Sequence, residues 1–308
     1  MSAYFAIVPD ITCDLSSDIR EKYDIDFVPG HFSVSGKEYC GSLKWDFSDR
    51  HEFYESLRKS PSGFKTSPPN VAEFEAVFEK YAKDNIPVLC PVISSGMSGT
   101  YNFAVQARDR ILKKYHDTKI AVLDSLRFSA AMGLMAVNAS IMRQKGMSFE
   151  EVVKALEESK LGYHQIGWLD DLPFSAKQGR INNSAAFFGT LIGIKPLGDI
   201  DTNGMTTVVG KAKGEKNAYN AILSYVEKTG LNLSEQSVII SHSDREKNAV
   251  ELKKMIEERF KVKEVLMTTV FPSCGVSIGP GLMAVYYVGK PVEQGLGKEK
   301  EIMKECLV

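Results

Sequence analysis

The chain has 308 residues, of which 44% are hydrophobic and 25% charged, a globular balance with room for one large or two ordinary domains. Its 38 basic and 39 acidic residues give a formal charge of −1, so no basic excess favours binding to nucleic acid or to an anionic membrane surface. No apolar run is long enough to cross a bilayer, and the N-terminus carries no basic targeting region. The five scattered cysteines form no Cys-x-x-Cys pair, which suits a reducing compartment. These features predict a cytoplasmic protein.

The first half of the chain alternates short apolar runs with amphipathic runs, a pattern typical of a parallel β-sheet covered by helices. Strands are predicted at 4–8, at 25–34 with a break at Pro29-Gly30, at 86–93 and at 119–123. Helices are predicted at 16–23, 49–59, 71–81, 101–115, 128–145 and 148–159. Two of them open with a capping signature, Asn70 before Glu73 and Ser148 before Glu151. Residues 65–70, with two consecutive prolines, are expected to form a rigid loop.

The second half mixes strands and helices in a less regular order. Strands are predicted at 162–169, from 194, and at 205–213, 237–241, 264–270 and 282–288. Helices are predicted at 183–192, 215–228, 245–260 and in the charged tail. A turn signal at 201–204 joins two of the strands into a hairpin. The sequence therefore predicts an α/β fold with two domains. Residues 1–160 form an N-terminal parallel sheet with helices on both faces, and residues 161–308 form a C-terminal α+β domain.

The segment 93–101, Ile-Ser-Ser-Gly-Met-Ser-Gly-Thr-Tyr, lies between a predicted buried strand and a predicted helix. It holds two glycines and four hydroxyl residues, namely Ser94, Ser95, Gly96, Ser98, Gly99 and Thr100. A helix N-terminus presents unpaired backbone N–H groups at the positive end of the helix dipole, and hydroxyls add uncharged donors. The segment thus has the features of a cradle for a weakly charged anion such as a carboxylate. The competing interpretation is a loop that only caps the helix.

Better-known motifs are absent. A P-loop requires a lysine that this segment lacks, and Gly96 and Gly99 supply only the last pair of the dinucleotide fingerprint. The nucleophile elbow needs one residue more than the run from Gly96 to Gly99 provides. The five scattered histidines form no His-Glu-x-x-His pattern, so no metal site is predicted. Asp10 and Thr12, after the first strand, are equally suited to contact a ligand or to cap the next helix.

Several short stretches, taken in order, resemble the DegV family. They are Asp10-x-Thr12 with Asp14-Leu15, Thr66-Ser67 with Pro69, the run Ser94 to Thr100, Asp124-Ser125, Gly179-Arg180-Ile181, Ile194-Lys195-Pro196 and Gly279-Pro280-Gly281. Together they span nearly the whole chain, and in this order they are specific. The resemblance implies a two-domain protein that holds one long-chain fatty acid between its domains. It also implies a carrier without catalytic residues or a cofactor, whose partner is a bacterial fatty acid kinase that makes acyl phosphate.

The resemblance also assigns roles by position. Thr66 and Ser95 match the contacts to the fatty acid carboxylate. Three residues, Ser94, Ser98 and Gly99, match those that shape the cradle around it. A further arginine, Arg180, matches one at the pocket mouth that faces the kinase, and residues 187–192 match one wall of the acyl tunnel.

The sequence departs from the family pattern at three positions. Ile11 stands where the family usually has serine, Lys213 where it usually has arginine, and Ser277 where it often has histidine. Lysine loses the two-pronged grip of arginine, and serine cannot take up a proton near neutral pH. With Arg180, the last two positions belong to the expected pocket mouth. We therefore expect normal fatty acid binding but weak presentation to a kinase adapted to the usual pattern.

Two other functions remain open from the residues themselves. A hydrolase or acyltransferase could use Ser95 or Ser98 as nucleophile, although no histidine stands in a recognisable triad context. A binder of phosphate, sugar phosphate or nucleotide could use the cradle as an anion site, although the missing P-loop lysine weighs against it.

Overall fold

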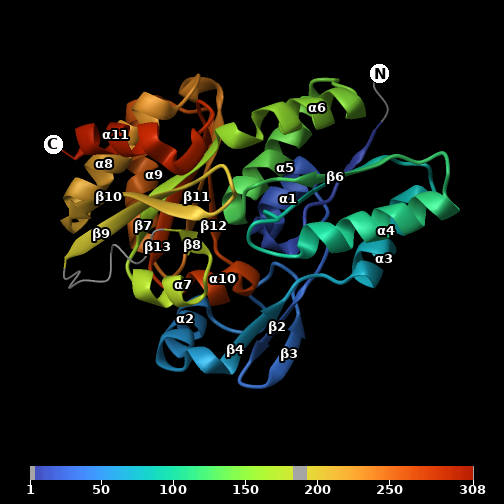
Figure 1. Ribbon diagram of the computed structural model, residues 1–308, viewed down its shortest axis with the longest axis horizontal. Helices are drawn as coiled ribbons and strands as arrows, with labels where there is room; N and C mark the ends of the chain where they lie inside the picture. The colour runs from blue at the N-terminus through green and yellow to red at the C-terminus, as the bar shows by residue number, and fades with distance from the viewer. Residues whose placement is uncertain (1–3, 183–192, 308) are drawn as a thin grey trace.

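The computed structural model describes residues 4–182 and 193–307, so the predicted helix at 183–192 lies outside the described residues. In these residues the strands form three sheets: a three-stranded parallel sheet, a seven-stranded mixed sheet and a three-stranded antiparallel sheet (Figure 1). In the described part of the chain, no helix is long and apolar enough to cross a membrane.

The N-terminal sheet is parallel and covered on both faces, as predicted. Its order is β1 (Ala6–Ile7), β5 (Val88–Val92), β6 (Ile120–Asp124). One face carries α3 (Val71–Ala82) and α4 (Thr100–Lys114), and the other carries α1 (Ser17–Tyr23), α5 (Ser129–Gln144) and α6 (Phe149–Ser159). Successive residues of a strand point to opposite faces. Ala6 accordingly packs in the cluster with Phe74 of α3, whereas Ile7 packs in the cluster with Leu134 of α5.

The C-terminal sheet has seven strands, all from residues after 160. Their order is β12 (Glu264–Thr269), β11 (Ser237–His242), β13 (Leu282–Val288), β7 (Tyr163–Leu169), β9 (Ile194–Ile200), β10 (Thr206–Lys213) and β8 (Ile181–Asn182). The sheet is mixed, because β11 and β12 are parallel while β13 is antiparallel to both β11 and β7. One face is covered by α8 (Gly214–Thr229), α9 (Glu246–Phe260) and α11 (Gly297–Cys306).

Helix α5 lies between the parallel sheet and the mixed sheet (Figure 1). It contacts β1 and β5 on one side and β7, β11 and β13 on the other. Its sequence, rich in alanine and methionine, is apolar nearly all round, which is the pattern of a helix buried on every side. The same cluster of buried side chains therefore runs from the parallel sheet through α5 to the mixed sheet.

The third sheet is a small antiparallel one, and it corrects two expectations. It consists of β2 (His31–Val34), β3 (Lys37–Cys40) and β4 (Phe64–Ser67), and α2 (Arg50–Lys59) lies between β3 and β4 in the chain. The strand predicted at 25–34 with a break at Pro29-Gly30 is present only after that break, from His31 to Val34. Part of the expected rigid loop, Phe64–Ser67, is a strand. Its polar side chains are exposed, so the sequence shows no alternation of apolar and polar residues that would predict a strand there.

Other local predictions are confirmed. Asn70 and Glu73 form a reciprocal capping box at α3, and Ser148 and Glu151 form another at α6. The hairpin between β9 and β10 turns at 201–204, as its sequence indicated. Two short helices, α7 (Leu172–Lys177) and α10 (Pro272–Ile278), were not predicted, because each is too short to show helical periodicity.

Candidate functional site

A cavity of about 200 Å³ lies between the first half of the chain and the mixed sheet. The first half contributes the 3₁₀ turn Ile11–Cys13, β4, the loop after β5 and Phe128. The second half contributes β7, α7, β8, β9, β10, α10 and β13. Its apolar wall includes Ile11, Ile93, Met97, Phe128, Leu169, Leu172, Val208, Ile278 and Leu282. The hydroxyl-bearing lining residues are Thr12, Thr66, Ser67, Ser98, Thr100, Ser175, Thr206, Ser273 and Ser277.

Among the described lining residues, one side chain, Arg180, carries a formal charge. Arg180 is exposed, and its guanidinium donates a hydrogen bond to the carbonyl of Gln178. Thr66 is also exposed, whereas Thr12 and Thr100 are buried. The cavity therefore has a rim with one cation and several hydroxyls, and a deeper part that is largely apolar.

The loop 93–99 is held mainly by hydrogen bonds within the protein. The N–H of Ile93 donates to the carboxylate of Asp10 at 2.7 Å, and the N–H of Ser95 donates to Asp124 at 3.1 Å. Inside the loop, the N–H of Gly96 donates to the hydroxyl of Ser94, and the N–H of Met97 donates to the Ser94 carbonyl. Most backbone N–H groups that the expected cradle would offer to a ligand are therefore already hydrogen-bonded within the protein. A ligand here would contact the hydroxyl groups of the loop before any backbone N–H group.

Asp10 caps the 3₁₀ turn Ile11–Cys13, which is one of the two roles that its sequence position suggested. One carboxylate oxygen accepts from both the N–H and the hydroxyl of Thr12, and the other accepts from Ile93. Asp10 thus joins the end of the first strand to the start of the loop 93–99. Thr12, its neighbour, lies in the cavity wall.

Four of the predicted site residues line the cavity: Thr66, Ser98, Arg180 and Ser277. The hydroxyl of Ser98 is 2.7 Å from that of Thr100, at the start of α4. The other four, Ser94, Ser95, Gly99 and Lys213, are outside the described lining.

The four residues outside the lining lie in different places, with Gly99 exposed at the N-cap of α4. Ser94 is fully buried beneath the loop, whereas Ser95 is exposed. Lys213 is exposed at the residue before α8. The expected pocket mouth is therefore divided, because Arg180 and Ser277 face the cavity and Lys213 does not.

The loop also packs closely against the turn between β9 and β10. A Cβ at Gly96 would lie 2.3 Å from the carbonyl oxygen of Asn203, and one at Gly204 would lie 1.9 Å from the Ser94 hydroxyl. Real Cβ contacts are never so short, so both positions require glycine. Ser94 and Gly96 consequently fix the contact between the two halves of the chain rather than the cavity surface.

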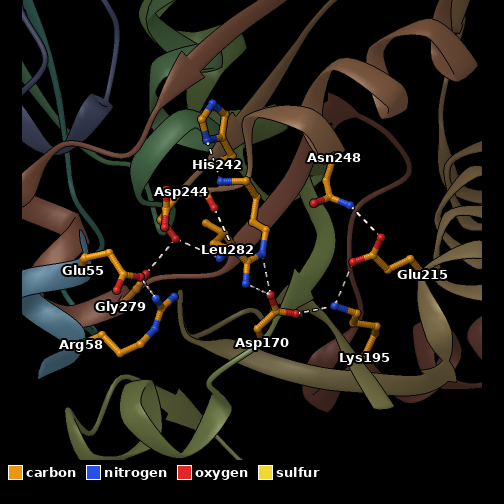
Figure 2. Close-up of polar contacts among 12 residues, drawn as sticks. Glu55, Arg58, Asp170, Lys195, Glu215, His242, Asp244, Asn248, Gly279 and Leu282 are labelled. Carbon is orange, nitrogen blue, oxygen red and sulfur yellow. Dashed lines mark hydrogen bonds and ion pairs between the residues drawn. The ribbon is translucent and has the colours of Figure 1, made fainter. Parts of the chain in front are cut away.

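A charged network lies at the end of β7, beside the cavity (Figure 2). Asp170 pairs with Lys195 at 2.6 Å and accepts a hydrogen bond from Nε of Arg245 at 2.6 Å. Lys195 also pairs with Glu215, whose other oxygen accepts from Asn248 at 3.0 Å. The network joins the end of β7, the start of β9 and the starts of α8 and α9. It thereby fixes the strand ends that carry the lining residues Leu169 and Pro196.

Several lining residues were not singled out in the sequence, notably Gln165, Thr206 and Ser273. Ser273 and Ser277 are one helical turn apart on α10, a helix that was itself missed. In β7, Gln165 and its neighbour His164 are polar residues between Tyr163 and the apolar run from Ile166 to Leu169. That polar interruption is the one signal that could have marked Gln165.

The fold is that of an α/β protein with a mostly apolar cavity, open at its rim, between two sheet-bearing halves. The family model described as uncharacterised protein, DegV family, matches residues 4–290. The chain therefore belongs to the DegV family, and its fold is the two-domain DegV fold.

Individual relatives agree over nearly the whole chain. A DegV domain-containing protein of Clostridium perfringens is 32% identical over 94% of this chain and 99% of its own. A Thermotoga maritima protein, described as revealing a fatty-acid-binding function, is 28% identical with a TM-score of 0.78, covering 93% of this chain and 99% of its own. The fatty acid kinase B3 protein of Streptococcus pneumoniae, solved with linoleic acid, has a TM-score of 0.78 at 21% identity, covering 94% of this chain and 100% of its own. That last likeness concerns the fold alone.

Proposed function

We propose that this protein binds one long-chain fatty acid in the cavity and acts as a carrier rather than as an enzyme. The observation that carries the proposal is the distribution of polarity in the cavity wall, with one exposed cation and a few hydroxyls at the rim and apolar side chains behind them. A fatty acid has the matching distribution, one carboxylate and a long alkyl chain. The fatty-acid-binding function of the Thermotoga maritima relative supports the same ligand class.

The energetics suit a weakly held head group. Each buried methylene contributes ~0.8 kcal/mol, so a chain of common length gains on the order of 10 kcal/mol before ordering costs. The carboxylate then needs orientation more than strong binding. Thr66, Ser98 and Arg180 line the cavity, and we propose that the two hydroxyls donate to the carboxylate while Arg180 balances its charge. Ser95, the contact implied by the family pattern, is exposed outside the lining, and its role stays a prediction.

The carrier role is also favoured over the serine-hydrolase alternative by one observation. The hydroxyl of Ser98 is hydrogen-bonded to Thr100, and no histidine is among the described residues that line the cavity. Three histidines, His31, His51 and His164, are paired with carboxylates elsewhere. His164, for example, is buried between Asp199 and the carbonyl of Lys290. A measurable esterase rate that disappears in Ser98→Ala would favour the hydrolase instead.

We further propose that the bound acyl group is presented to a fatty acid kinase in the cytoplasm. The kinase partnership follows from the family pattern, and Arg180 is suited to contact a partner because it is both exposed and at the cavity rim. A reducing compartment agrees with the free cysteines of the described chain, which are Cys13, Cys40, Cys90, Cys274 and Cys306.

Native mass spectrometry of protein purified from cells, followed by organic extraction, tests the proposal. The expected result is one long-chain fatty acid for each chain. After removal of lipid, added fatty acid at 100 times its dissociation constant should add about 2.7 kcal/mol to the free energy of unfolding. If extraction gives no lipid and added fatty acid leaves the melting temperature unchanged, the proposal is wrong. Retention of phosphate or a nucleotide would select the phosphate-binder alternative.

A further inference from the structure

Gln165 is a polar side chain in the inner wall of the cavity. It lies on β7, where alternate residues face opposite sides of the mixed sheet. Ile166 and Trp168 pack in the cluster under α8, whereas Tyr163 and Leu169 pack in the cluster around α5. Gln165 shares the latter face, and Leu169 lines the same cavity. Its side chain therefore faces the ligand space, not the helices behind the sheet.

The carboxamide of Gln165 is not fully hydrogen-bonded by the described part of the protein. The residue is 5% exposed, and its Oε1 atom has no hydrogen-bond partner among the described residues. A buried carbonyl without a partner is costly, because it has lost its water without replacement. An all-alkyl ligand lying against Gln165 would leave that cost in place. A ligand group that can hydrogen-bond to the carboxamide would remove it.

The fatty acid carboxylate is a poor candidate for this position. A buried carboxylate requires a cation or several donors, and Arg180 is at the exposed rim. The nearby cation His164 is already paired with Asp199, whose carboxylate also accepts from the Gln165 backbone N–H at 3.0 Å, so His164 is not free to balance a second carboxylate. The group that satisfies Gln165 must therefore be neutral and must lie along the chain.

We infer that the cavity has a second polar subsite at Gln165, which selects a hydroxyl group on the acyl chain. A hydroxyl both donates and accepts, so it fits either orientation of the carboxamide, whereas a keto group only accepts. The preferred ligand is thus a hydroxylated long-chain fatty acid, with its carboxylate at the rim and its hydroxyl at Gln165. This inference rests on the proposed fatty-acid-binding function and specifies its ligand.

Calorimetric titration of the delipidated protein with stearic acid and a series of monohydroxystearic acids tests the subsite. For each variant, the measured quantity is the ratio of the dissociation constant of stearic acid to that of each isomer. Gln165→Met removes the carboxamide at nearly constant length, and Leu169→Met, on the same strand and in the same cavity, is the matched control. For one or two hydroxyl positions, we expect the ratio to fall about tenfold in Gln165→Met, the equivalent of one hydrogen bond, and to stay within twofold in Leu169→Met.

The outcomes are distinct. If the ratio is the same in Gln165→Met and the parent for every isomer, the subsite is absent although the fatty acid proposal stands. If Gln165→Met loses stearic acid and all isomers equally, Gln165 holds the carboxylate and the inference is overturned. If the parent binds none of the acids, the proposed function itself fails.

A second readout does not depend on whether a variant folds. The side-chain amide signals of Gln165 in the ¹⁵N-labelled parent should shift more with the preferred hydroxystearic acid than with stearic acid. Equal shifts would contradict the subsite.

Discussion

Asp14 accepts a hydrogen bond at 2.9 Å from the backbone N–H of Phe271, which is 257 residues further along the chain. The other oxygen of its carboxylate accepts from the hydroxyl of Ser129, at the start of α5. Asp14 is 1% exposed, and Phe271 immediately precedes α10, which lines the cavity. A single buried carboxylate therefore joins the first half of the chain, the central helix and the cavity-forming helix of the second half.

The first prediction concerns the pH dependence of stability. Burial raises the pKa of Asp14 to about 7, although the hydrogen bonds from Ser129 and Phe271 act in the opposite direction. An unfolded aspartate titrates near 3.9, so between about pH 4 and pH 7 the folded state binds the extra proton. Asp14 therefore stabilises the fold most at low pH and loses this contribution as the pH rises to 7. Asp14→Asn, which resembles the protonated form, should gain stability relative to the parent across that window, by at most about 1.4 kcal/mol per pH unit.

Urea unfolding of both proteins at intervals from pH 4 to pH 9 measures this difference. The difference between variant and parent should rise up to about pH 7 and then be constant. A difference that is flat across the whole range would mean that Asp14 titrates normally.

The second prediction concerns the buried pair of His164 and Asp199. Nδ1 of His164 lies 2.7 Å from the Asp199 carboxylate, and Nε2 lies 2.8 Å from the carbonyl of Lys290. Both partners can only accept, so both ring nitrogens donate and the imidazole is charged. Burial alone would lower the pKa of His164, but the charge of Asp199 outweighs it and the pKa is raised.

Asp199→Asn leaves that buried cation without its counter-charge and should lower the free energy of unfolding by about 3 kcal/mol at pH 6. The loss should shrink as the pH rises through the raised pKa of His164, because the parent then loses the ion pair as well. Glu305→Gln is the control, since it removes the partner of Lys228 in an exposed ion pair and should cost less than about 0.5 kcal/mol. Equal losses in the two variants would show that the buried pair contributes no more to the free energy of unfolding than the exposed pair does.

Much of the fold is predictable from local sequence signals. The parallel strands β1 and β5 are buried along their whole length and β6 is partly buried, so all three appear as apolar runs. The capping boxes at Asn70 and Ser148 are complete within four residues, and the structure confirms both. The doubly covered sheet and the mixed character of the second half follow from these elements.

The site is less predictable, because its walls come from segments that are distant in the chain. Nothing local in the sequence brings Asp14 to Phe271 or aligns Gln165 with the cavity, since both depend on how α5 packs between the sheets. In the same way, Ser94 and Ser95 are neighbours with the same hydroxyl, yet one is buried and the other exposed. The residue types that mark a cradle can be recognised in the sequence, but which hydroxyl faces a ligand is decided by tertiary packing.

The third prediction separates Ser98 from Ser95 as the partner of Thr66 at the carboxylate. The cavity favours Ser98, whereas the family pattern implies Ser95. Each lost donor to a carboxylate should cost about 1–3 kcal/mol of binding free energy. Thr66→Val with Ser98→Ala should therefore weaken fatty acid binding more than Thr66→Val alone, and Thr66→Val with Ser95→Ala should equal Thr66→Val. Titration calorimetry measures all three, and the reverse order would restore the Ser95 assignment.

The fourth prediction concerns Gly281, at the end of the Gly-Pro-Gly turn. Its φ is +100°, and a Cβ there would lie 2.7 Å from Cβ of Asp170, which Lys195 and Arg245 hold in place. Gly281→Ala should therefore destabilise the protein by both backbone strain and a clash. Gly36→Ala is the matched control, because its φ is +83° but its Cβ would meet no atom within 4 Å. We expect about 1–2 kcal/mol of strain in the control and at least about 1 kcal/mol more for Gly281→Ala. Equal melting temperatures would show that Asp170 moves aside without cost.

The last prediction concerns presentation of the acyl group, and it rests on the proposed function. The two departures from the family pattern at the expected pocket mouth differ in position, because Ser277 lines the cavity whereas Lys213 is exposed outside it. Serine cannot take up a proton near neutral pH, and histidine can. With a fatty acid kinase from a relative that has the usual histidine, Ser277→His should therefore raise the rate of acyl phosphate formation at least about tenfold, within the range of acid–base assistance. Lys213→Arg should change the rate less than threefold on its own.

Fatty acid affinity should stay within threefold of the parent in both variants and in the double variant, since neither change removes a wall of the alkyl slot. A radiolabelled phosphoryl transfer assay, with affinities measured in parallel, decides the matter. If the parent already reacts as fast as Ser277→His, the departure at position 277 is neutral; if Lys213→Arg alone accounts for the increase, the determinant lies on the outer surface and not in the cavity.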